Sequence, residues 1–312
     1  MSKSVIDWPL TPSLSPSDGE RDGVRGQSIT DLLIWPESAV PELNNETYAA
    51  ITNLIRSHRV WLIFNADDVE PRTHATNESD TVVFNAAILF APGEIPHGKV
   101  YHKQKLVIFG EYIPLLRWLP FVKWFTPITG SFTAGTEPAQ FEMLRWGERP
   151  REPLVELNNG SSGASPHQTV NTSPLICFED TFPQLARKAA STNTDFLVNL
   201  TNDGWFGESA EQWQHEQGAI FRAVESGIPL VRCANNGITC WIDANGRVRE
   251  VFQDKTKSVY GAGAMTIDLP LSSRTPTFYN RHGDWFGWGC TVVAFGLLLT
   301  RMNLLARTKK AA

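Results

Sequence analysis

Short apolar runs alternate with amphipathic segments along most of the chain. The runs at 31–35 (DLLIW) and 60–66 (VWLIFNA) predict buried strands, and the segment between them has apolar residues at helical spacing. Helices are also expected at 182–190 and 211–225. Further strands are predicted at 81–92, 174–180, 195–202, 229–235, 239–248 and 263–270. Apolar strands that alternate with helices are typical of an α/β protein whose sheets are covered by helices.

Two segments lack this pattern. Residues 1–28 hold Ser and Pro between scattered charges, without apolar periodicity and without the apolar core of a signal peptide, so we expect a disordered leader. Residues 157–173 are rich in Gly, Ser and Asn and predict a surface loop inserted into the domain. The folded domain is therefore expected to span 29–284.

The C-terminal part of the chain is strongly apolar. Residues 285–300 contain no charge, and Arg301 separates them from a second short apolar stretch. A membrane span needs about 20 residues, which 285–306 supplies if Arg301 reaches the interface. We therefore predict a transmembrane helix at 285–306 followed by a basic tail at 307–312, with a buried core helix as the alternative.

Composition excludes several classes of function. The 312 residues include 28 Lys and Arg against 33 Asp and Glu, for a net charge of -5, and no basic cluster is present. A nucleic-acid partner is therefore not expected. The four Cys and seven His show no metal-ligand spacing, and no Gly-rich phosphate loop carries the required Lys, so we predict neither a metal nor a cofactor.

Three residues near strand ends could carry chemistry together. Cys177 lies at the end of an apolar strand, Glu37 follows Pro36 at the end of the first strand, and Lys103 lies past the strand at 81–92. Taken singly, such residues are most often a buried hydrophobe and two surface charges. Taken together, a thiol, a carboxylate and an ammonium suit acyl transfer through a thioester.

The same residues lie in a set of spaced motifs. WPE at 35–37, Y-x-K-x-x-L at 101–106 running into FGEY at 109–112, and ICFED at 176–180 resemble the Glu, Lys and Cys motifs of the nitrilase superfamily of carbon-nitrogen hydrolases. The resemblance implies an α-β-β-α sandwich. It also implies that Cys177 is the nucleophile, Glu37 the general base and Lys103 the cation that stabilises the oxyanion, with Lys105 as the competing lysine.

Three neighbouring residues have supporting roles by the same resemblance. Glu111 is a supporting carboxylate, and the backbone N–H of Phe178 is a second oxyanion donor. Glu179 matches the family pattern, with a less defined role. Outside these motifs, the i,i+3 spacing of Arg222 and Glu225 on the helix at 211–225 favours a structural ion pair.

Within the superfamily, 198–207, 214–239 and 281–286 resemble the bacterial apolipoprotein N-acyltransferases. That resemblance implies a phospholipid acyl donor, a diacylglyceryl-cysteine lipoprotein as acceptor, and a catalytic domain facing the periplasm at the inner membrane. The apolar segment 112–125, with two cations, could dip into the membrane interface, and a buried core segment is the alternative.

The chain departs from that family at its N-terminal side. Members have a transmembrane bundle before the catalytic domain, and a strand and helix before the strand that bears WPE. We therefore expect a sandwich without that first strand and helix, with membrane helices supplied by a separate chain. A nitrilase-type amidase acting on a small amide and a non-catalytic remnant remain as alternatives.

Overall fold

The computed structural model describes residues 32–40, 43–72, 81–92, 98–114, 131–145, 168–271 and 276–311. The leader predicted at 1–28, most of the segment 112–125 and most of the loop 157–173 lie outside these residues.

The first sheet contains four strands in the order β1-β2-β3-β4. Its strands are β1 (Leu32–Ile34), β2 (Trp61–Pro71), β3 (Thr81–Phe90) and β4 (Lys99–His102). β1 runs parallel to β2, and the other pairs are antiparallel. Helix α1 (Asn45–His58) connects β1 to β2, as the hydrophobic pattern predicts, and starts at Asn44, whose side chain accepts from the Thr47 N–H. Its apolar residues Ile51 and Ile55 pack on the sheet.

The second sheet contains six strands in the order β10-β9-β8-β7-β6-β5. They are β5 (Phe141–Arg145), β6 (Gln168–Ile176), β7 (Phe196–Asn202), β8 (Leu230–Asn235), β9 (Cys240–Ile242) and β10 (Val248–Val251). The central strands β6, β7 and β8 are parallel, so their carboxyl ends meet at one edge. The connecting elements are η2 (Cys177–Thr181), α2 (Pro183–Ala189), η3 (Asp203–Phe206) and α3 (Glu211–Ser226).

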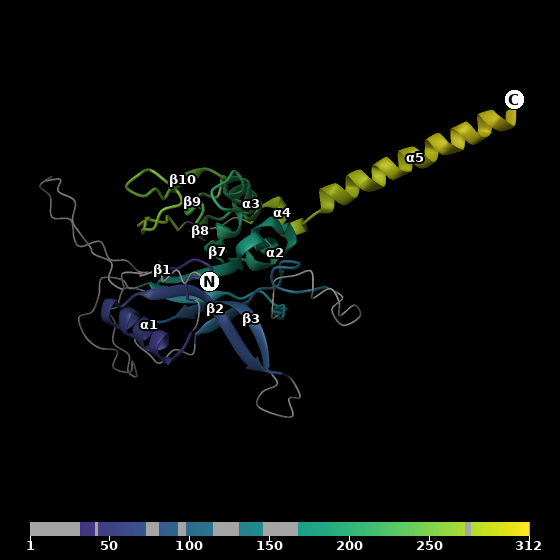
Figure 1. The fold of residues 1–312 in the computed structure, drawn as a ribbon. Coiled ribbons are helices and arrows are strands. Elements are labelled where there is room, and N and C mark those ends of the chain that lie inside the picture. The colour runs from purple at the N-terminus through teal and green to yellow at the C-terminus, as the bar shows by residue number, and fades with distance from the viewer. Residues whose placement is uncertain are drawn as a thin grey trace, which may run out of the picture.

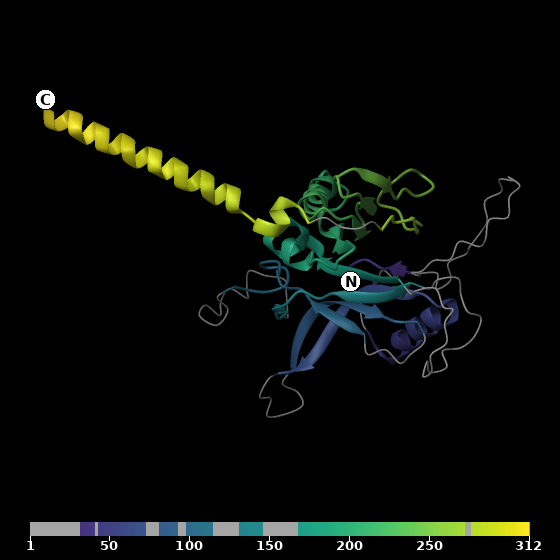
Figure 2. The same ribbon diagram turned by 180° about the vertical axis from the view of Figure 1, so that it is seen from behind.

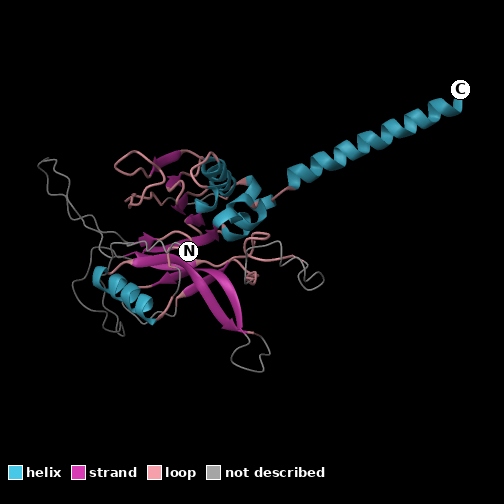
Figure 3. Cartoon of the chain, viewed as in Figure 1, coloured by secondary structure: helices cyan, strands magenta, loops and turns pink. Residues whose placement is uncertain are grey.

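The two sheets pack face to face between helical layers (Figures 1, 2 and 3). Ile63, Tyr101 and Phe141 belong to the core that fills the space between the sheets, together with Val198 from β7. A second core lies between the six-stranded sheet and helices α2 and α3, and a third lies under α1. This is the predicted α-β-β-α sandwich. Within the described residues β1 is an edge strand of this sheet.

Three predictions of secondary structure were wrong. The strand predicted at 174–180 ends at Ile176, because Cys177–Thr181 form the 3-10 helix η2. Residues 263–270 form no strand; they run alongside the sheets without a ladder, and Ile267 and Leu269 pack on the inter-sheet core. The predicted loop at 157–173 ends too late, because β6 begins at Gln168. Its polar residue Thr172 is buried and donates to the Phe196 carbonyl, so polarity there does not indicate exposure. The short strands β4 and β5 were not predicted.

The C-terminal helix leaves the sandwich. A short helix, α4 (Phe278–His282), lies against α2, where Arg187 donates to the carbonyls of Asn280 and Arg281. Helix α5 (Trp285–Ala311) then projects away from the domain in both ribbon views (Figures 1 and 2). Its segment Trp285–Met302 has a mean hydropathy of 1.3, none of it is buried, and it is long and apolar enough to cross a membrane.

Candidate active site

The predicted site residues meet where strands of the two sheets end. Glu37 follows β1, Lys103 follows β4, and Cys177 follows β6. Glu37 and Lys103 are almost completely buried, and Cys177 is half-buried. The fold therefore brings together three residues that are up to 140 positions apart in the sequence.

Glu37 is held by donors from both sheets. Its Oε1 accepts from Lys103 Nζ at 3.1 Å and from Asn85 Nδ2 at 2.9 Å, and its Oε2 accepts from the Asn202 N–H at 3.0 Å. Asn85 in turn accepts from Asn65 Nδ2 at 2.6 Å. Sequence reasoning missed both Asn residues, although each interrupts an apolar strand and is therefore a buried polar residue that needs a partner.

Lys103 lies between two carboxylates. Its Nζ donates to Glu111 Oε1 at 2.7 Å as well as to Glu37, and Glu111 Oε2 accepts from the Val107 N–H. Burial alone would lower the pKa of Lys103, but Glu37, the Cys177 sulfur and Glu111 together raise it. The lysine therefore stays an ammonium in a site that excludes water.

Cys177 occupies a sharp turn between β6 and η2. Its φ of 55° lies in the left-handed region, which is unusual for a residue other than glycine and is often found at functional sites. Its carbonyl oxygen accepts from Asn199 Nδ2 at 3.1 Å, which fixes the turn from the neighbouring strand β7. The side chain therefore lies at a constrained position at the end of the parallel strands.

The thiol of Cys177 has a high pKa. Burial and the negative charge of Glu37 raise the pKa to about 12, against the lowering effects of Lys103, a hydrogen bond from the Thr201 side chain and a hydrogen bond from the Phe178 N–H. At neutral pH the resting group is therefore a thiol, and reaction at sulfur requires a base within the site.

Phe178 and Glu179 directly follow Cys177 and contact Lys103 and the residues after it. The Phe178 ring lies 5.6 Å from Lys103 Nζ, a cation–π contact. Glu179 is fully buried and accepts four hydrogen bonds, from the Tyr101 hydroxyl and three backbone N–H groups, and burial raises its pKa. The three N–H groups belong to Gln104, Lys105 and Ile176. Glu179 therefore ties the end of β6, just before Cys177, to the loop after Lys103. Lys105 itself is exposed, with Nζ 5.5 Å from the Phe182 ring.

A second cluster of charges lies beneath the turn, between the six-stranded sheet and α3. His215 bonds Asp180 through Nε2 at 3.0 Å and Asp203 through Nδ1 at 2.9 Å. The fully buried Arg232 lies 3.3 Å from Asp180 and 2.6 Å from Asp203. Burial alone would lower the pKa of His215, but the bonds to Asp180 and Asp203 prevail and raise it to about 9. Sequence reasoning missed this cluster because its members lie on four different elements.

The predicted pair on α3 is present and adjoins this cluster. Arg222 Nη2 lies 2.6 Å from Glu225 Oε2, which confirms the ion pair expected from the i,i+3 spacing. Arg222 also donates to the carbonyl of Asp180 at 2.9 Å, so the pair ties α3 to the turn after Cys177.

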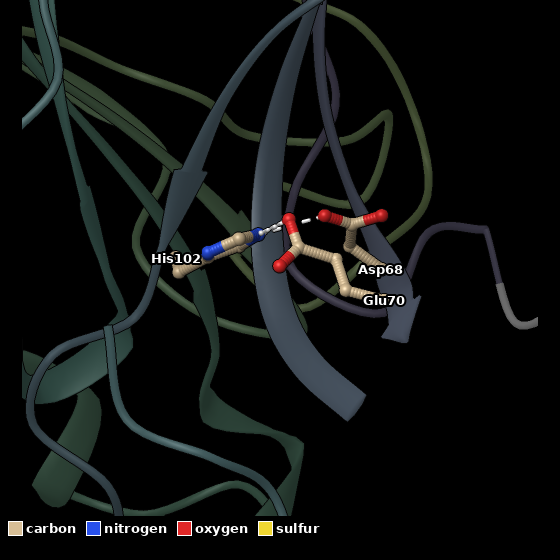
Figure 4. Close-up of side chains that lie close together, drawn as sticks. All are labelled: Asp68, Glu70 and His102. Atoms are coloured by element: carbon tan, nitrogen blue, oxygen red, sulfur yellow. Dashed lines mark hydrogen bonds and ion pairs between the residues drawn. The ribbon is translucent and has the colours of Figure 1, made fainter. Parts of the chain in front are cut away.

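Among the described residues, three ligand-type side chains also gather on the outer face of the first sheet (Figure 4). His102 Nε2 hydrogen-bonds Asp68 Oδ2 at 2.7 Å, and Glu70 Oε1 lies 3.9 Å away. The His102 ring stacks on Phe84 at 3.9 Å. This group has the chemistry to hold a divalent cation. However, all three side chains are partly exposed, and the Asp–His hydrogen bond alone accounts for the arrangement.

Comparison with known proteins identifies the family. The family model described as carbon-nitrogen hydrolase matches residues 25–273. The chain belongs to the carbon-nitrogen hydrolase family. Within the carbon-nitrogen hydrolases, this chain is similar to the apolipoprotein N-acyltransferase of Geobacter metallireducens, with 32% identity over 269 residues, 85% of this chain and 44% of the relative. The corresponding protein of Bdellovibrio bacteriovorus is 30% identical over 288 residues, 90% of this chain and 48% of the relative.

This chain thus spans about half the length of these two relatives. Among solved structures, an amidase from Nesterenkonia sp. matches with a TM-score of 0.43 and 18% identity, covering 71% of this chain and 73% of that one.

Proposed function

We propose that the chain is the catalytic part of an N-acyltransferase that moves an acyl chain from a phospholipid, through a thioester on Cys177, to the N-terminal amine of a diacylglyceryl-cysteine lipoprotein. The observation that supports acyl transfer is the buried Lys103 ammonium held between Glu37 and Glu111 beside a thiol. Similarity to apolipoprotein N-acyltransferases over most of the chain supports the choice of substrates.

In the first half-reaction, a Glu37 oxygen accepts the thiol proton as sulfur attacks the ester carbonyl of the phospholipid. The negative charge that develops on the carbonyl oxygen is stabilised by Lys103 Nζ and by the Phe178 N–H. Collapse breaks the bond to the glycerol oxygen, which leaves with the proton from Glu37. The products are an acyl thioester on Cys177 and a lysophospholipid.

In the second half-reaction, the amine of the acceptor attacks the thioester carbonyl and Glu37 accepts a proton from the amine. Collapse of the tetrahedral intermediate breaks the carbon–sulfur bond and forms the amide. The sulfur recovers its proton from Glu37, and the site returns to its starting state. Glu111 keeps Lys103 in place, and Glu179 keeps the two strand ends together.

The substrates require a membrane setting. Helix α5 satisfies the length and hydropathy of a span, and we propose that it anchors a domain at 29–284 to the bacterial inner membrane, facing the periplasm. The same cysteine chemistry with water as acceptor and a small amide as donor would give an amidase, which is the second candidate.

The test uses the full chain in phospholipid vesicles with a synthetic diacylglyceryl-cysteine peptide. Transfer of a labelled acyl chain to the peptide amine is expected for the parent and for Cys233→Ser, which changes a partly buried thiol on β8, and not for Cys177→Ser. Release of ammonia from short amides without peptide acylation would favour the amidase. Equal transfer by Cys177→Ser would contradict the proposal.

A further inference from the structure

Thr201 is a neighbour of the Cys177 thiol that takes no part in the two half-reactions proposed above. Thr201 lies on β7, two residues after Asn199, so both side chains point to the same face of the sheet. Thr201 is fully buried and follows Leu200, the register partner of Ile176, so it lies beside Cys177 at the ends of β7 and β6. Its hydroxyl donates to Asp203 Oδ1 at 3.1 Å, and hydrogen bonding by its side chain contributes to lowering the pKa of the Cys177 thiol. It is therefore the link between the thiol and the charged cluster beneath it.

Asp203 is fixed without help from Thr201. Its Oδ1 accepts from His215 Nδ1 at 2.9 Å, and its Oδ2 accepts from Arg232 Nη2 at 2.6 Å. Gly237 leaves room for the carboxylate, because a Cβ there would lie 2.4 Å from Oδ2. The pKa of Asp203 is lowered, since these hydrogen bonds and charges outweigh the effect of burial. Asp203 thus remains an ionised and satisfied acceptor whichever way the hydroxyl points.

A hydroxyl carries one proton and two lone pairs, so Thr201 can donate to only one of its two neighbours at a time. While Cys177 is a thiol, the S–H can donate to Thr201 and the hydroxyl can donate to Asp203. Once Glu37 has taken the thiol proton, sulfur becomes an acceptor. The hydroxyl can then turn to the sulfur, because Asp203 keeps its bonds to His215 and Arg232.

We propose that Thr201 is a catalytic residue whose hydroxyl turns from Asp203 to the sulfur of Cys177 when the thiolate forms, and that Asp203 is its positioning residue. No atom is transferred to Thr201 in this step, and its O–H bond stays intact. The inference rests on the proposed role of Cys177 as nucleophile and adds a donor to sulfur that the Glu, Lys and Cys motifs do not contain.

The charged groups that face the thiol are Glu37 from the loop after β1 and Lys103 from the end of β4. Those that face Asp203 are His215 from α3 and Arg232 from β8. A test must leave these four groups in place. Thr201→Val does so, since it replaces the hydroxyl by a methyl group of similar size.

The experiment measures the rate of alkylation of Cys177 by iodoacetamide between pH 7 and pH 10, by peptide mass spectrometry on the full chain. Loss of one hydrogen bond to the thiolate should raise the thiol pKa by about one unit. The thiolate fraction then falls about tenfold, and the higher basicity of the remaining thiolate offsets part of this, leaving a rate about threefold lower. Thr201→Ser restores the hydroxyl and should restore the parent rate.

Thr172→Val is the matched control, because Thr172 is equally buried and donates to a backbone carbonyl away from the sulfur. It should alkylate at the parent rate. If Thr201→Val does not fold, Thr201→Ala provides the same comparison. Equal rates for the parent and the hydroxyl-free variant overturn the role of Thr201 and leave the proposed function standing. If the parent forms no acyl adduct on Cys177 from a labelled phospholipid, the proposed function fails instead, whatever the alkylation rates are.

Discussion

The sandwich contains two buried charge clusters that differ in their balance. At the strand ends, Glu37 and Glu111 share the single cation Lys103, so one formal negative charge is left over. Beneath the Cys177 turn, two aspartates face two cations, His215 and Arg232, and the formal charges cancel.

The difference in net charge suggests that the two clusters have different roles. An unbalanced cluster keeps a carboxylate available to accept a proton beside the thiol, which suits chemistry. A balanced cluster with its hydrogen bonds satisfied keeps its charges at neutral pH and fixes the shape of its surroundings. The predictions below test whether the first cluster governs rate and the second governs stability.

The largest expected effect is on stability. His215→Leu leaves Asp180 and Asp203 facing one cation in place of two, and breaking a buried ion pair costs about 3–5 kcal/mol. Urea denaturation followed by circular dichroism measures the change. A loss below about 1 kcal/mol would mean that the balanced cluster does not hold the fold.

The next effect is on rate. Lys103→Met removes the cation that pairs with both Glu37 and Glu111, and loss of an oxyanion donor lowers the rate by about 10²–10³-fold. Formation of the acyl adduct on Cys177 is the measurement. Lys105→Met is the control, since the Lys105 side chain is exposed and its ammonium lies over the Phe182 ring, and it should retain the parent rate. Equal losses in both variants would contradict the assignment of Lys103.

The balanced cluster should also respond to pH. The folded-state pKa of His215, about 9, lies above its ordinary value of 6.5, so its contribution is complete below pH 6.5 and is lost as the pH rises through 9. The shift corresponds to about 3 kcal/mol at most. Urea midpoints of the parent at pH 6 and pH 9.5, set against those of His215→Gln, isolate this contribution. Equal pH slopes for the two proteins would show that His215 is not held as an imidazolium.

The smallest effect is expected at the exposed group on the first sheet. His102→Leu removes the hydrogen bond to Asp68 between two partly exposed side chains, and exposed polar pairs of this kind contribute about 0–1 kcal/mol. The same urea measurement applies. If His102→Leu lowers the free energy of unfolding as much as His215→Leu does, burial does not explain the difference expected between the two histidines.

Sequence reasoning found residues that belong to spaced motifs or to one helix, and it missed residues that only the packing of the fold brings together. Glu37, Lys103 and Cys177 each follow an apolar strand or its neighbour, and spaced motifs identified all three. The pair Arg222–Glu225 followed from helical periodicity. The cluster of Asp180, Asp203, His215 and Arg232 could not be derived in this way, since only the packing of α3 on the sheet brings it together.

The errors in secondary structure have a similar origin. Strand β6 begins in a polar stretch whose Thr172 is buried and hydrogen-bonded, so a polar pattern predicted a loop. Residues 263–270 have the alternation of a strand, but no described strand pairs with them, and their apolar side chains pack without a ladder. Local pattern indicates which face of a segment is buried, while strand pairing depends on distant partners.

The most direct test of the account is whether Cys177 carries an acyl chain. The full chain is incubated in vesicles with a phospholipid labelled in its acyl chain, and the adduct is located by peptide mass spectrometry with and without hydroxylamine. The account predicts a hydroxylamine-sensitive acyl group on Cys177 that Glu37→Gln and Cys177→Ser do not form. No adduct on Cys177, or the same adduct in Cys177→Ser, would contradict it.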